Sequence, residues 1–255
     1  LGEGVSATFD ILLDDLVSFG DFNLLLTLTA DYINNFGDVA EYAKEVPFSI
    51  DVSLNQAGFP VSTAELRSSP LVIDLDNDGN DEIIIGDYSG LVHIYNSDGS
   101  ELIDDTFPYD TGDQIWGSVA AADLDNDGLT DFVVNSKSKH IYIFDQNGLK
   151  TDYNTNRYLI GTPAIGNLDD DDDLEVVIGG YSSPTSSNPI FVINADGSDV
   201  DGFPLVLGEK VKGGIALADF NGNGKDDMVL GTDSDNIHLI YDDGNSASGF
   251  PFTAG

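Results

Sequence analysis

The chain of 255 residues contains no cysteine and only nine basic residues, against 46 acidic ones. Without cysteine, neither disulfide bonds nor thiolate metal sites can form. A formal net charge of −37 repels nucleic acid and anionic membranes, so we expect neither as a partner. No apolar run reaches membrane-spanning length, and we expect no membrane insertion. The partners that remain are cations, or surfaces met through bound cations.

Most of the acidic residues are aspartates, 38 beside eight glutamates. Aspartate has the short side chain that suits turns and metal-binding loops. With 41% hydrophobic residues, the chain can also bury a core, unlike a disordered acidic tail. The chain begins at Leu1 and shows no signal peptide. We therefore expect a piece of a longer polypeptide, whose remainder is its covalent partner.

One acidic pattern of nine residues recurs four times. Its first, third, fifth and ninth residues are mostly carboxylates, and its sixth is usually glycine, which turns where a Cβ would clash. These segments, called loops one to four, span residues 74–82, 123–131, 167–175 and 219–227. Their first residues are 49, 44 and 52 positions apart. Alternate side chains of a tight loop can point at one ion, and oxygen ligands suit Ca²⁺. The pattern predicts up to four calcium sites.

The candidate side-chain ligands stand at the first, third, fifth and ninth positions of each loop. They are Asp74, Asp76, Asp78, Glu82, Asp123, Asp125, Asp127, Asp131, Asn167, Asp169, Asp171, Glu175, Asp219, Asn221, Asn223 and Asp227. Because affinity follows ligand charge, we expect loop four, which has two carboxylates and two asparagines at these positions, to bind most weakly. In loop three Asp172 replaces the glycine, and we expect it to take the left-handed turn.

The loops are distinct from an EF-hand, which needs a bidentate glutamate at position twelve between two helices. Position twelve is here Ile85, Val134, Ile178 or Leu230, each within a strand-like run. The competing interpretation is a set of Asp-rich turns without metal. Four copies at regular spacing favour metal binding over that alternative.

Each loop belongs to a longer repeat with a constant order of strands. A strand of small residues precedes the loop, an apolar strand follows it, and a third strand ends at an Asx-Gly turn. A fourth strand carries Phe-Pro in three repeats, and Tyr153 takes that place in the second. Proline suits an outer edge strand. The sequence therefore predicts an all-β fold, a β-propeller of four-stranded blades over residues 55–255.

The flanking segments suggest that the ring is incomplete. A fifth outer-strand match at residues 58–60 precedes the first repeat. We therefore expect four blades of a larger ring of about seven. Residues 1–54 do not repeat, with strand-like runs at 7–13, 22–30 and 48–52 and a helical turn or irregular loop at 38–44. We interpret them as part of an immunoglobulin-like β-sandwich, or alternatively as an N-terminal extension packed on the next domain.

The four loops, each followed by an apolar strand ending near Gly86, Asn135, Gly179 or Gly231, resemble FG-GAP or VCBS-type repeats. Such repeats form the integrin α-subunit propeller and occur in many secreted bacterial proteins. The resemblance covers about residues 55–255 and implies that each loop's seventh residue donates its backbone carbonyl to calcium. Those residues are Asn80, Leu129, Asp173 and Lys225. It also implies that the calcium loops face away from the usual ligand-binding loops.

Residues for catalysis are scarce, and no nucleophile, zinc or phosphate-binding motif is present. The three histidines, His93, His140 and His238, fall on strands, where packing is the simplest role for His93 and His238. Trp116 and Tyr181 lie in connections that could contact a sugar or protein ligand. The competing interpretation for both is packing in the core or rim.

Together these observations predict a non-catalytic, calcium-stabilised propeller module of a secreted or cell-surface protein, used for adhesion, recognition or as a rigid scaffold. An extracellular location is expected because weak calcium loops fill only where calcium is plentiful. The alternatives are an accessory domain of a secreted hydrolase such as a protease, or a propeller-type polysaccharide lyase. With nine basic residues, an anionic polysaccharide fits such a lyase poorly.

Overall fold

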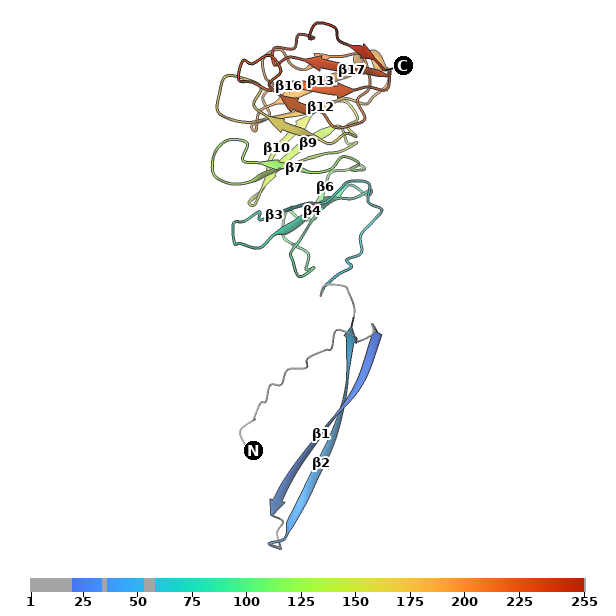
Figure 1. Ribbon diagram of the computed structural model, residues 1–255, viewed down its shortest axis with the longest axis vertical. Helices are drawn as coiled ribbons and strands as arrows, with labels where there is room; N and C mark the ends of the chain where they lie inside the picture. The colour runs from blue at the N-terminus through green and yellow to red at the C-terminus, as the bar shows by residue number, and fades with distance from the viewer. Residues whose placement is uncertain (1–19, 34–35, 53–57, 255) are drawn as a thin grey trace. The chain divides into compact units, whose positions relative to one another are not determined.

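The computed structural model describes residues 20–33, 36–52 and 58–254 (Figure 1). The chain divides into two compact units, Leu1–Pro60 and Val61–Gly255, which are taken separately below. In the described ranges, no helix has the length and apolar character needed to cross a membrane.

The first unit contains a two-stranded antiparallel sheet. β1 (Gly20–Ile33) pairs with β2 (Val39–Val52) along its whole length, from Gly20 opposite Val52 to Ile33 opposite Val39. The helical turn or loop predicted at 38–44 is wrong, because most of that segment is extended in β2. Pairing with β1 overrides its weak local preference. The strand predicted at 7–13 lies outside the described residues, so the choice between sandwich and extension stays a prediction.

The second unit is the propeller, built from four four-stranded antiparallel sheets. The first and second blades comprise β3 (Leu71–Ile73), β4 (Glu82–Gly86), β5 (Leu91–Tyr95), β6 (Tyr109–Asp110), β7 (Ala120–Ala122), β8 (Asp131–Asn135), β9 (His140–Asp145) and β10 (Gly148–Asn154). The third and fourth comprise β11 (Ala164–Gly166), β12 (Glu175–Gly179), β13 (Pro189–Ile193), β14 (Leu205–Val206), β15 (Ala216–Ala218), β16 (Asp227–Gly231), β17 (Asn236–Ile240) and β18 (Phe252–Thr253). A 3₁₀ turn spans Thr185–Ser187. The blades follow one another in chain order without closing a ring (Figure 1). Their four-stranded antiparallel sheets confirm the predicted propeller fold.

The hydrophobic core lies between neighbouring blades. In one cluster, Ile84 and Ile94 of the first blade pack with Phe132 and Phe144 of the second, and all four are at most 1% exposed. The middle strands are covered on both faces, which explains why their sequences are continuous apolar runs rather than alternating ones. Each such side chain stabilises the fold by roughly 1.5–3 kcal/mol. A single blade has no core of its own, so the blades stabilise one another.

Glycines let the chain segments before the inner strands approach closely. A Cβ on Gly117 would lie 2.2 Å from the Gly161 carbonyl oxygen, and one on Gly161 would lie 2.4 Å from the Gly213 carbonyl oxygen. Next to Gly117, the Ser118 amide donates a hydrogen bond to Thr162 Oγ1 of the following blade at 3.1 Å. Only glycine permits this backbone contact.

The outer strands differ from expectation in two ways. Phe-Pro stands just before the outer strand rather than in it, and the strands that follow, β6, β14 and β18, have two residues each. No strand forms at the fifth match, Phe59-Pro60, so the prediction of an additional outer strand is wrong. An outer strand needs a third strand to pair with, and each third strand of the propeller already pairs with the outer strand of its own blade.

Strand direction gives each blade two different ends. Because the strands are antiparallel, loops one to four share one end of the blades with the turns between third and fourth strands. The turns between second and third strands, and the connections between blades, lie at the other end. These are called the acidic end and the opposite end below.

Candidate metal centre

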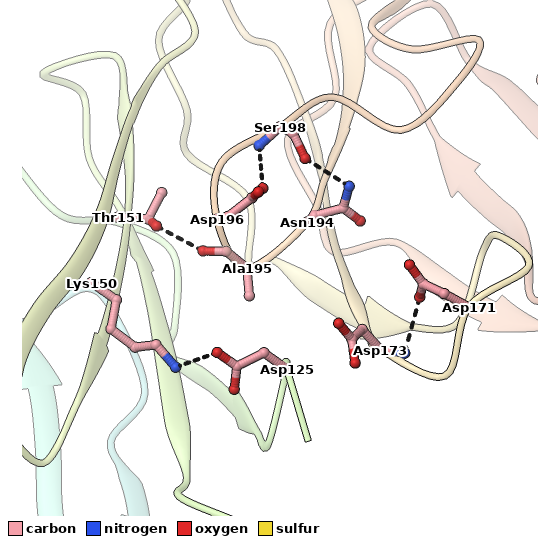
Figure 2. A pocket seen from close by; sticks show the side chains of 9 residues that line it. All are labelled: Asp125, Lys150, Thr151, Asp171, Asp173, Asn194, Ala195, Asp196 and Ser198. Carbon is pink, nitrogen blue, oxygen red and sulfur yellow. Dashed lines mark hydrogen bonds and ion pairs between the residues drawn. The ribbon is translucent and has the colours of Figure 1, made fainter. Parts of the chain in front are cut away.

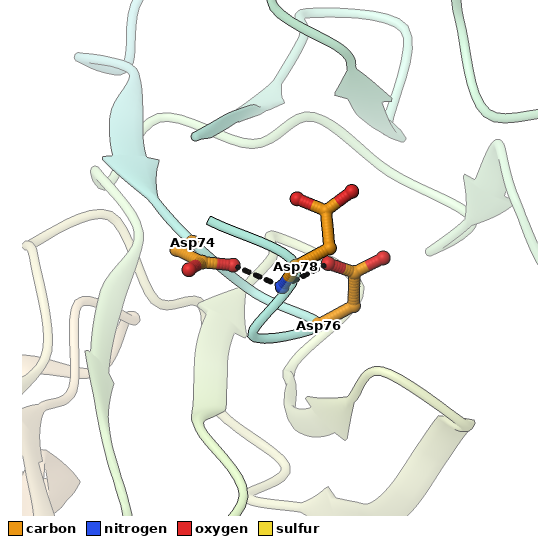
Figure 3. A group of neighbouring side chains, drawn as sticks. All are labelled: Asp74, Asp76 and Asp78. Atoms are coloured by element: carbon orange, nitrogen blue, oxygen red, sulfur yellow. Dashed lines mark hydrogen bonds between the residues drawn. The ribbon is translucent and has the colours of Figure 1, made fainter. Parts of the chain in front are cut away.

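Among the residues that the structure describes, three clusters of carboxylates could hold a metal ion, and loop one carries the first. Oxygens of Asp74, Asp76 and Asp78 lie within 4.8 Å of one another. Figure 3 shows the Asp78 amide donating to Asp74 Oδ1 and Asp76 Oδ1, at 3.1 and 3.2 Å. The Gly79 amide donates to Asp74 Oδ2 at 3.0 Å. These backbone bonds hold the carboxylates together, so that their remaining lone pairs could surround a cation.

The ninth residue of every loop is a buried carboxylate at the start of the second strand. One oxygen of each accepts a hydrogen bond from the amide of the loop's second residue. The bonds join Leu75 to Glu82 at 3.0 Å, Leu124 to Asp131 at 3.0 Å, Leu168 to Glu175 at 2.5 Å and Phe220 to Asp227 at 2.8 Å. The ninth residue therefore ties the start of its loop to the second strand.

Loop three has a buried carboxylate oxygen without a partner. Oxygens of Asp169, Asp171 and Glu175 lie within 4.8 Å of one another. Glu175 is fully buried, and its Oε1 has no hydrogen-bond partner. Burial raises the pKa of Glu175 to about 7, with further increases from the neighbouring aspartates and an opposing effect of the Leu168 amide. A cation at this position would relieve both the repulsion and the missing hydrogen bond.

The backbone of loop three differs from that of the other loops. In loop one Asn77 and Gly79 have positive φ values of 60° and 91°, and loops two and four repeat this at their fourth and sixth positions. Asp172 has no positive φ, so the left-handed turn predicted there is wrong. A left-handed Asp costs about 1–2 kcal/mol, and the loop takes another path. Its first residue, Asn167, donates Nδ2 to the Asp171 carbonyl at 3.0 Å instead of accepting amides.

Loop two differs again, because a lysine ammonium lies among its carboxylates. Oxygens of Asp123, Asp125 and Asp127 lie within 4.8 Å of one another. Lys150 Nζ lies 2.8 Å from Asp131 Oδ1, 2.9 Å from Asp125 Oδ2 and 3.7 Å from Asp127 Oδ2. Figure 2 shows the Lys150 side chain reaching down to Asp125. The lysine thus contacts three of the four carboxylates that the sequence assigns to calcium.

The path of β10 explains how Lys150 reaches the loop. β10 has seven residues, whereas the outer strands that follow Phe-Pro have two. It lacks the proline, so its amides can continue the ladder to β9. The register shifts between Leu149 and Thr151, a β-bulge with Lys150 as the extra residue. Bulges redirect side chains, and this one directs Lys150 toward the acidic end. In the sequence, two features of this outer strand indicated the contact: it lacks the proline that precedes the other outer strands, and it contains a lysine.

Burial lowers the pKa of Lys150, but hydrogen bonds to Asp131 and Asp125 outweigh burial and raise the pKa overall. The ammonium is therefore charged at any physiological pH. Asp131 is fully buried, and Lys150 is its charge partner. Asp125 Oδ1 is buried without a hydrogen-bond partner, so the ammonium leaves part of the loop's acceptor capacity unused.

Loop four gathers no group of three carboxylates in the described part of the chain. Its asparagines donate their side-chain amides to a residue that the sequence did not indicate, Asp242, which follows β17. Asn223 Nδ2 donates to Asp242 Oδ1 at 2.9 Å, and the Asp242 amide donates to Asp227 Oδ1 at 3.1 Å. Lys225 Nζ lies 2.8 Å from the exposed Asp170 of loop three. Loop four is therefore held together largely by hydrogen bonds and neighbouring side chains.

The seventh residues make the same bond in all four loops. The amides of Asn80, Leu129, Asp173 and Lys225 donate to the fifth side chain at 2.8, 2.8, 3.0 and 2.9 Å. The calcium-ligand role expected of their carbonyls stays a prediction, as does the order of calcium affinities of the four loops.

A cavity of about 340 Å³ lies between loops two and three (Figure 2). Its lining includes Asp125, Lys150, Asp171 and Asp173, so it belongs to the same acidic end.

Trp116 and Tyr181 lie at the opposite end and are half-buried. The Trp116 ring stacks with Tyr88 at a centroid distance of 6.3 Å. Lys210 Nζ lies 5.0 Å from the centroid of the Tyr181 ring. The structure thus places both residues at one end but at different blade junctions. Their ligand-binding role stays a prediction.

Two of the histidines are buried and bonded to carboxylates. His93 Nδ1 lies 2.5 Å from Glu101 Oε1, and His93 Nε2 lies 3.2 Å from Asp87 Oδ2. His238 lies 3.3 Å from Glu209 Oε2. Burial raises the pKa of Asp87, but hydrogen bonds from Ser89, the Leu91 amide and His93 lower it overall to about 2. His140 contacts Asp152.

Comparison with known proteins supports the repeat and the fold. Residues 74–134 match the model of the FG-GAP-like repeat. None of the curated proteins compared with the chain matches it. The mercury-soaked crystal structure of BBS1N in complex with ARL6DN has a TM-score of 0.54 and 13% identity, over 78% of this chain and 56% of that chain. The lead-soaked crystal gives 0.53 and 14%, over 75% and 54%.

The chain spans about half the length of the BBS1N chains it matches, and at such identities the likeness shows the fold alone. The Vibrio cholerae biofilm matrix protein Bap1 has 20% identity over 71% of this chain and 39% of its own, with a TM-score of 0.38. The resemblance expected from the acidic loops is confirmed: residues 74–134 carry an FG-GAP-like repeat within a β-propeller fold.

Proposed function

We propose that this chain is a calcium-stabilised, non-catalytic propeller module of a secreted or cell-surface protein, serving adhesion or recognition on a rigid scaffold. The observation that carries the proposal is Glu175 Oε1, a fully buried carboxylate oxygen without a hydrogen-bond partner beside Asp169 and Asp171. Burying such a charge alone costs several kcal/mol. A bound cation removes that cost, and an all-oxygen set of ligands suits calcium.

In this proposal Asp74, Asp76 and Asp78 hold one ion, and Asp169, Asp171 and Glu175 hold another. The ion supplies positive charge to carboxylates that otherwise repel one another. In loop three it also joins the loop to the second strand, because Glu175 begins β12. Calcium is then a structural cross-link within a blade, a role that disulfides cannot play in a chain without cysteine.

The extracellular location follows from the kind of site. Surface loops of this type bind calcium in the range of about 10⁻⁴–10⁻³ M when they belong to extracellular modules. Such sites fill outside the cell and stay empty at cytosolic calcium levels. A measured calcium dissociation constant in this range would support the extracellular location, and a much lower one would remove the reason for it.

Differential scanning calorimetry with and without EDTA tests the proposal. A site at a hundredfold excess of ligand over Kd adds about 2.7 kcal/mol, which is roughly 5–10 °C in melting temperature for a domain of this size. We expect a loss of at least this amount on chelation, restored by calcium and poorly by magnesium, which demands octahedral geometry. An unchanged melting temperature after chelation would overturn the proposal.

A further inference from the structure

The basic residues are unevenly distributed over the propeller. Nine occur in the chain, and one of them, Lys44, lies on β2. Of the other eight, Lys150 and Lys225 reach acidic loops. The remaining six all lie in connections or turns of the opposite end: Arg67, Lys137, Lys139, Arg157, Lys210 and Lys212. This end therefore holds six of the nine basic residues of the chain, next to acidic residues of the same turns and connections, Glu65, Asp87, Asp113, Glu209, Asp233 and Asp235.

The four lysines among these six residues have aromatic rings, rather than carboxylates, near their ammonium groups. Lys137 Nζ lies 4.8 Å from the Trp116 ring centroid, and Lys139 Nζ lies 5.5 Å from that of Tyr158. Lys212 Nζ lies 5.6 Å from the Tyr181 centroid, on the ring that Lys210 also contacts. In the described part of the chain, no carboxylate oxygen lies within 4.0 Å of any of these four ammonium groups. Their charges are therefore open to an anion from outside.

Arg67 extends the same arrangement to the first blade. Its guanidinium carbon lies 4.6 Å from the Tyr88 centroid and 4.7 Å from the Trp116 centroid. It also pairs with the exposed Glu65 at 2.9 Å, a contact worth about 0–1 kcal/mol that an incoming anion could replace. Cations and rings thus occur together at three successive junctions: between blades one and two, two and three, and three and four.

The scaffold holds these side chains in place before any ligand arrives. Gln114 Oε1 accepts hydrogen bonds from Trp116 Nε1 at 3.0 Å and from Lys137 Nζ at 2.8 Å. The junctions repeat one backbone bond, from the Tyr88 amide to Glu65, from Lys137 to Gln114, from Tyr181 to Tyr158 and from Asp233 to Lys210, at 2.7–3.0 Å. Such preorganisation lowers the entropic cost of binding.

Several carboxylates at this end are already engaged. Asp87 is buried and accepts hydrogen bonds from Ser89 and the Leu91 amide. Glu209 accepts from Asn236 Nδ2 at 2.9 Å and contacts Thr232 and His238. Asp233 accepts the Lys210 amide at 3.1 Å. Asp113 and Asp235 add negative charge that a ligand must avoid.

We propose that the opposite end of the blades binds an acidic polysaccharide along the row of cation and ring pairs formed by Arg67, Tyr88, Trp116, Lys137, Lys139, Tyr158, Tyr181, Lys210 and Lys212. Tyr158 is 41% exposed, so its ring is open to the C–H face of a sugar ring, and the ammonium groups accept carboxylate or sulfate groups. Repetition of the pair at successive junctions fits a polymer with repeating charge better than a single compact anion. This inference rests on the proposed recognition function and names its ligand class.

The strongly acidic composition does not forbid such a ligand. A five-residue strand is about 17 Å long, so the acidic loops lie about two Debye lengths from the opposite end at physiological salt, where that length is about 8 Å. Their repulsion is therefore largely screened. The low basic total made an anionic sugar a poor fit in the sequence, whereas the placement of those residues favours it.

Calorimetric titration of the whole chain in millimolar calcium tests the proposal. The probes are hyaluronate as a carboxylated glycan, dextran sulfate as a sulfated one, dextran as a neutral control and polyglutamate as an acidic polypeptide. We expect one or both anionic glycans to bind, with dextran silent, and the hyaluronate and dextran sulfate arms to tell carboxylate from sulfate recognition. Exchange of Lys210 and Lys212 for Met should weaken binding at least tenfold and flatten its salt dependence. Lys44→Met, at an exposed lysine of β2 outside the propeller, is the control.

Trp116→Ala separates a sugar from an acidic protein. It should weaken glycan binding about tenfold, measured in calcium at a temperature where calorimetry shows the variant to be fully folded. If no anionic glycan binds better than dextran, the proposal is wrong, although chelation could still lower stability. If polyglutamate binds as tightly as the glycans and Trp116→Ala has no effect, an acidic protein replaces the polysaccharide. Cleavage of hyaluronate into unsaturated products would instead overturn the non-catalytic function and leave the binding surface standing.

Discussion

Loops two and three share a sequence pattern, but the buried carboxylate at the ninth position has different neighbours in the two loops. In loop two the fully buried Asp131 faces the Lys150 ammonium at 2.8 Å. In loop three the fully buried Glu175 has an oxygen with no hydrogen-bond partner. One loop therefore contains a cation from its own chain, and the other leaves a buried carboxylate oxygen without one. A shared set of ligands does not imply a shared dependence on metal.

The difference traces to one outer strand. β10 lacks proline, extends over seven residues and carries a bulge at Lys150, whereas β14 of the third blade follows Phe203-Pro204 and has two residues. β14 consists of Leu205 and Val206, so it offers no cationic side chain to its acidic loop. Under the proposed function, the outer strand of a blade thus helps to decide whether that blade depends on calcium.

The largest effect should come from Lys150→Met. Removing one partner of a buried ion pair costs about 3–5 kcal/mol, because Asp131 would be left charged and unpaired. We expect this loss in urea unfolding of the EDTA-treated protein. Lys225→Met is the matched control, since its partner Asp170 is exposed, and should cost about 0–1 kcal/mol. Equal stability of the Lys150 variant and the parent in EDTA would show that loop two does not depend on the lysine.

Calcium binding should rise in the same variant. With the ammonium removed, Asp123, Asp125, Asp127 and Asp131 are free to hold an ion. Isothermal titration should therefore find one more calcium per chain for Lys150→Met than for the parent. Millimolar calcium should restore most of the stability lost in EDTA. An unchanged stoichiometry would mean that the parent loop already binds calcium beside the lysine.

Glu175→Gln should act in the reverse sense. The exchange removes a buried charge that has no partner, so the calcium-free protein should gain roughly 1–3 kcal/mol. The same variant should lose one calcium and much of the stabilisation by calcium. Asp170→Asn is the control, since Asp170 is 95% exposed. A variant less stable than the parent in both EDTA and calcium would contradict the assignment.

A pH dependence should also be confined to the calcium-free protein. Burial raises the pKa of Glu175 to about 7 in the folded chain from 4.5 when exposed. The folded state therefore holds a proton that the unfolded state has lost between these values, and this contribution to stability falls as pH rises from about 4.5 to 7. Denaturation midpoints in EDTA should show this decline in the parent and a weaker one in Glu175→Gln. Parallel profiles for the two proteins would exclude Glu175 as the source.

The repeat pattern predicted much of the fold because its signals are local. Small residues before each loop, an apolar run after it and an Asx-Gly turn are read from neighbours in the sequence, and four copies reinforced one another. The segment 38–44 was misread because pairing with β1, and not its own residues, makes it extended. The turn at Asp172 was misread because glycine-like behaviour was expected of a residue for which another backbone path costs less.

The sequence by itself determined the blades, the carboxylate positions and the lack of disulfides, since each follows from residue type and spacing within about fifty positions. Only the tertiary structure decided which carboxylates receive a lysine, which are left without a partner, and that five scattered cations contact aromatic rings at one end. These outcomes depend on a bulge, on antiparallel direction and on blade stacking. Contacts of that kind join residues far apart in the chain, and spacing alone carries no record of them.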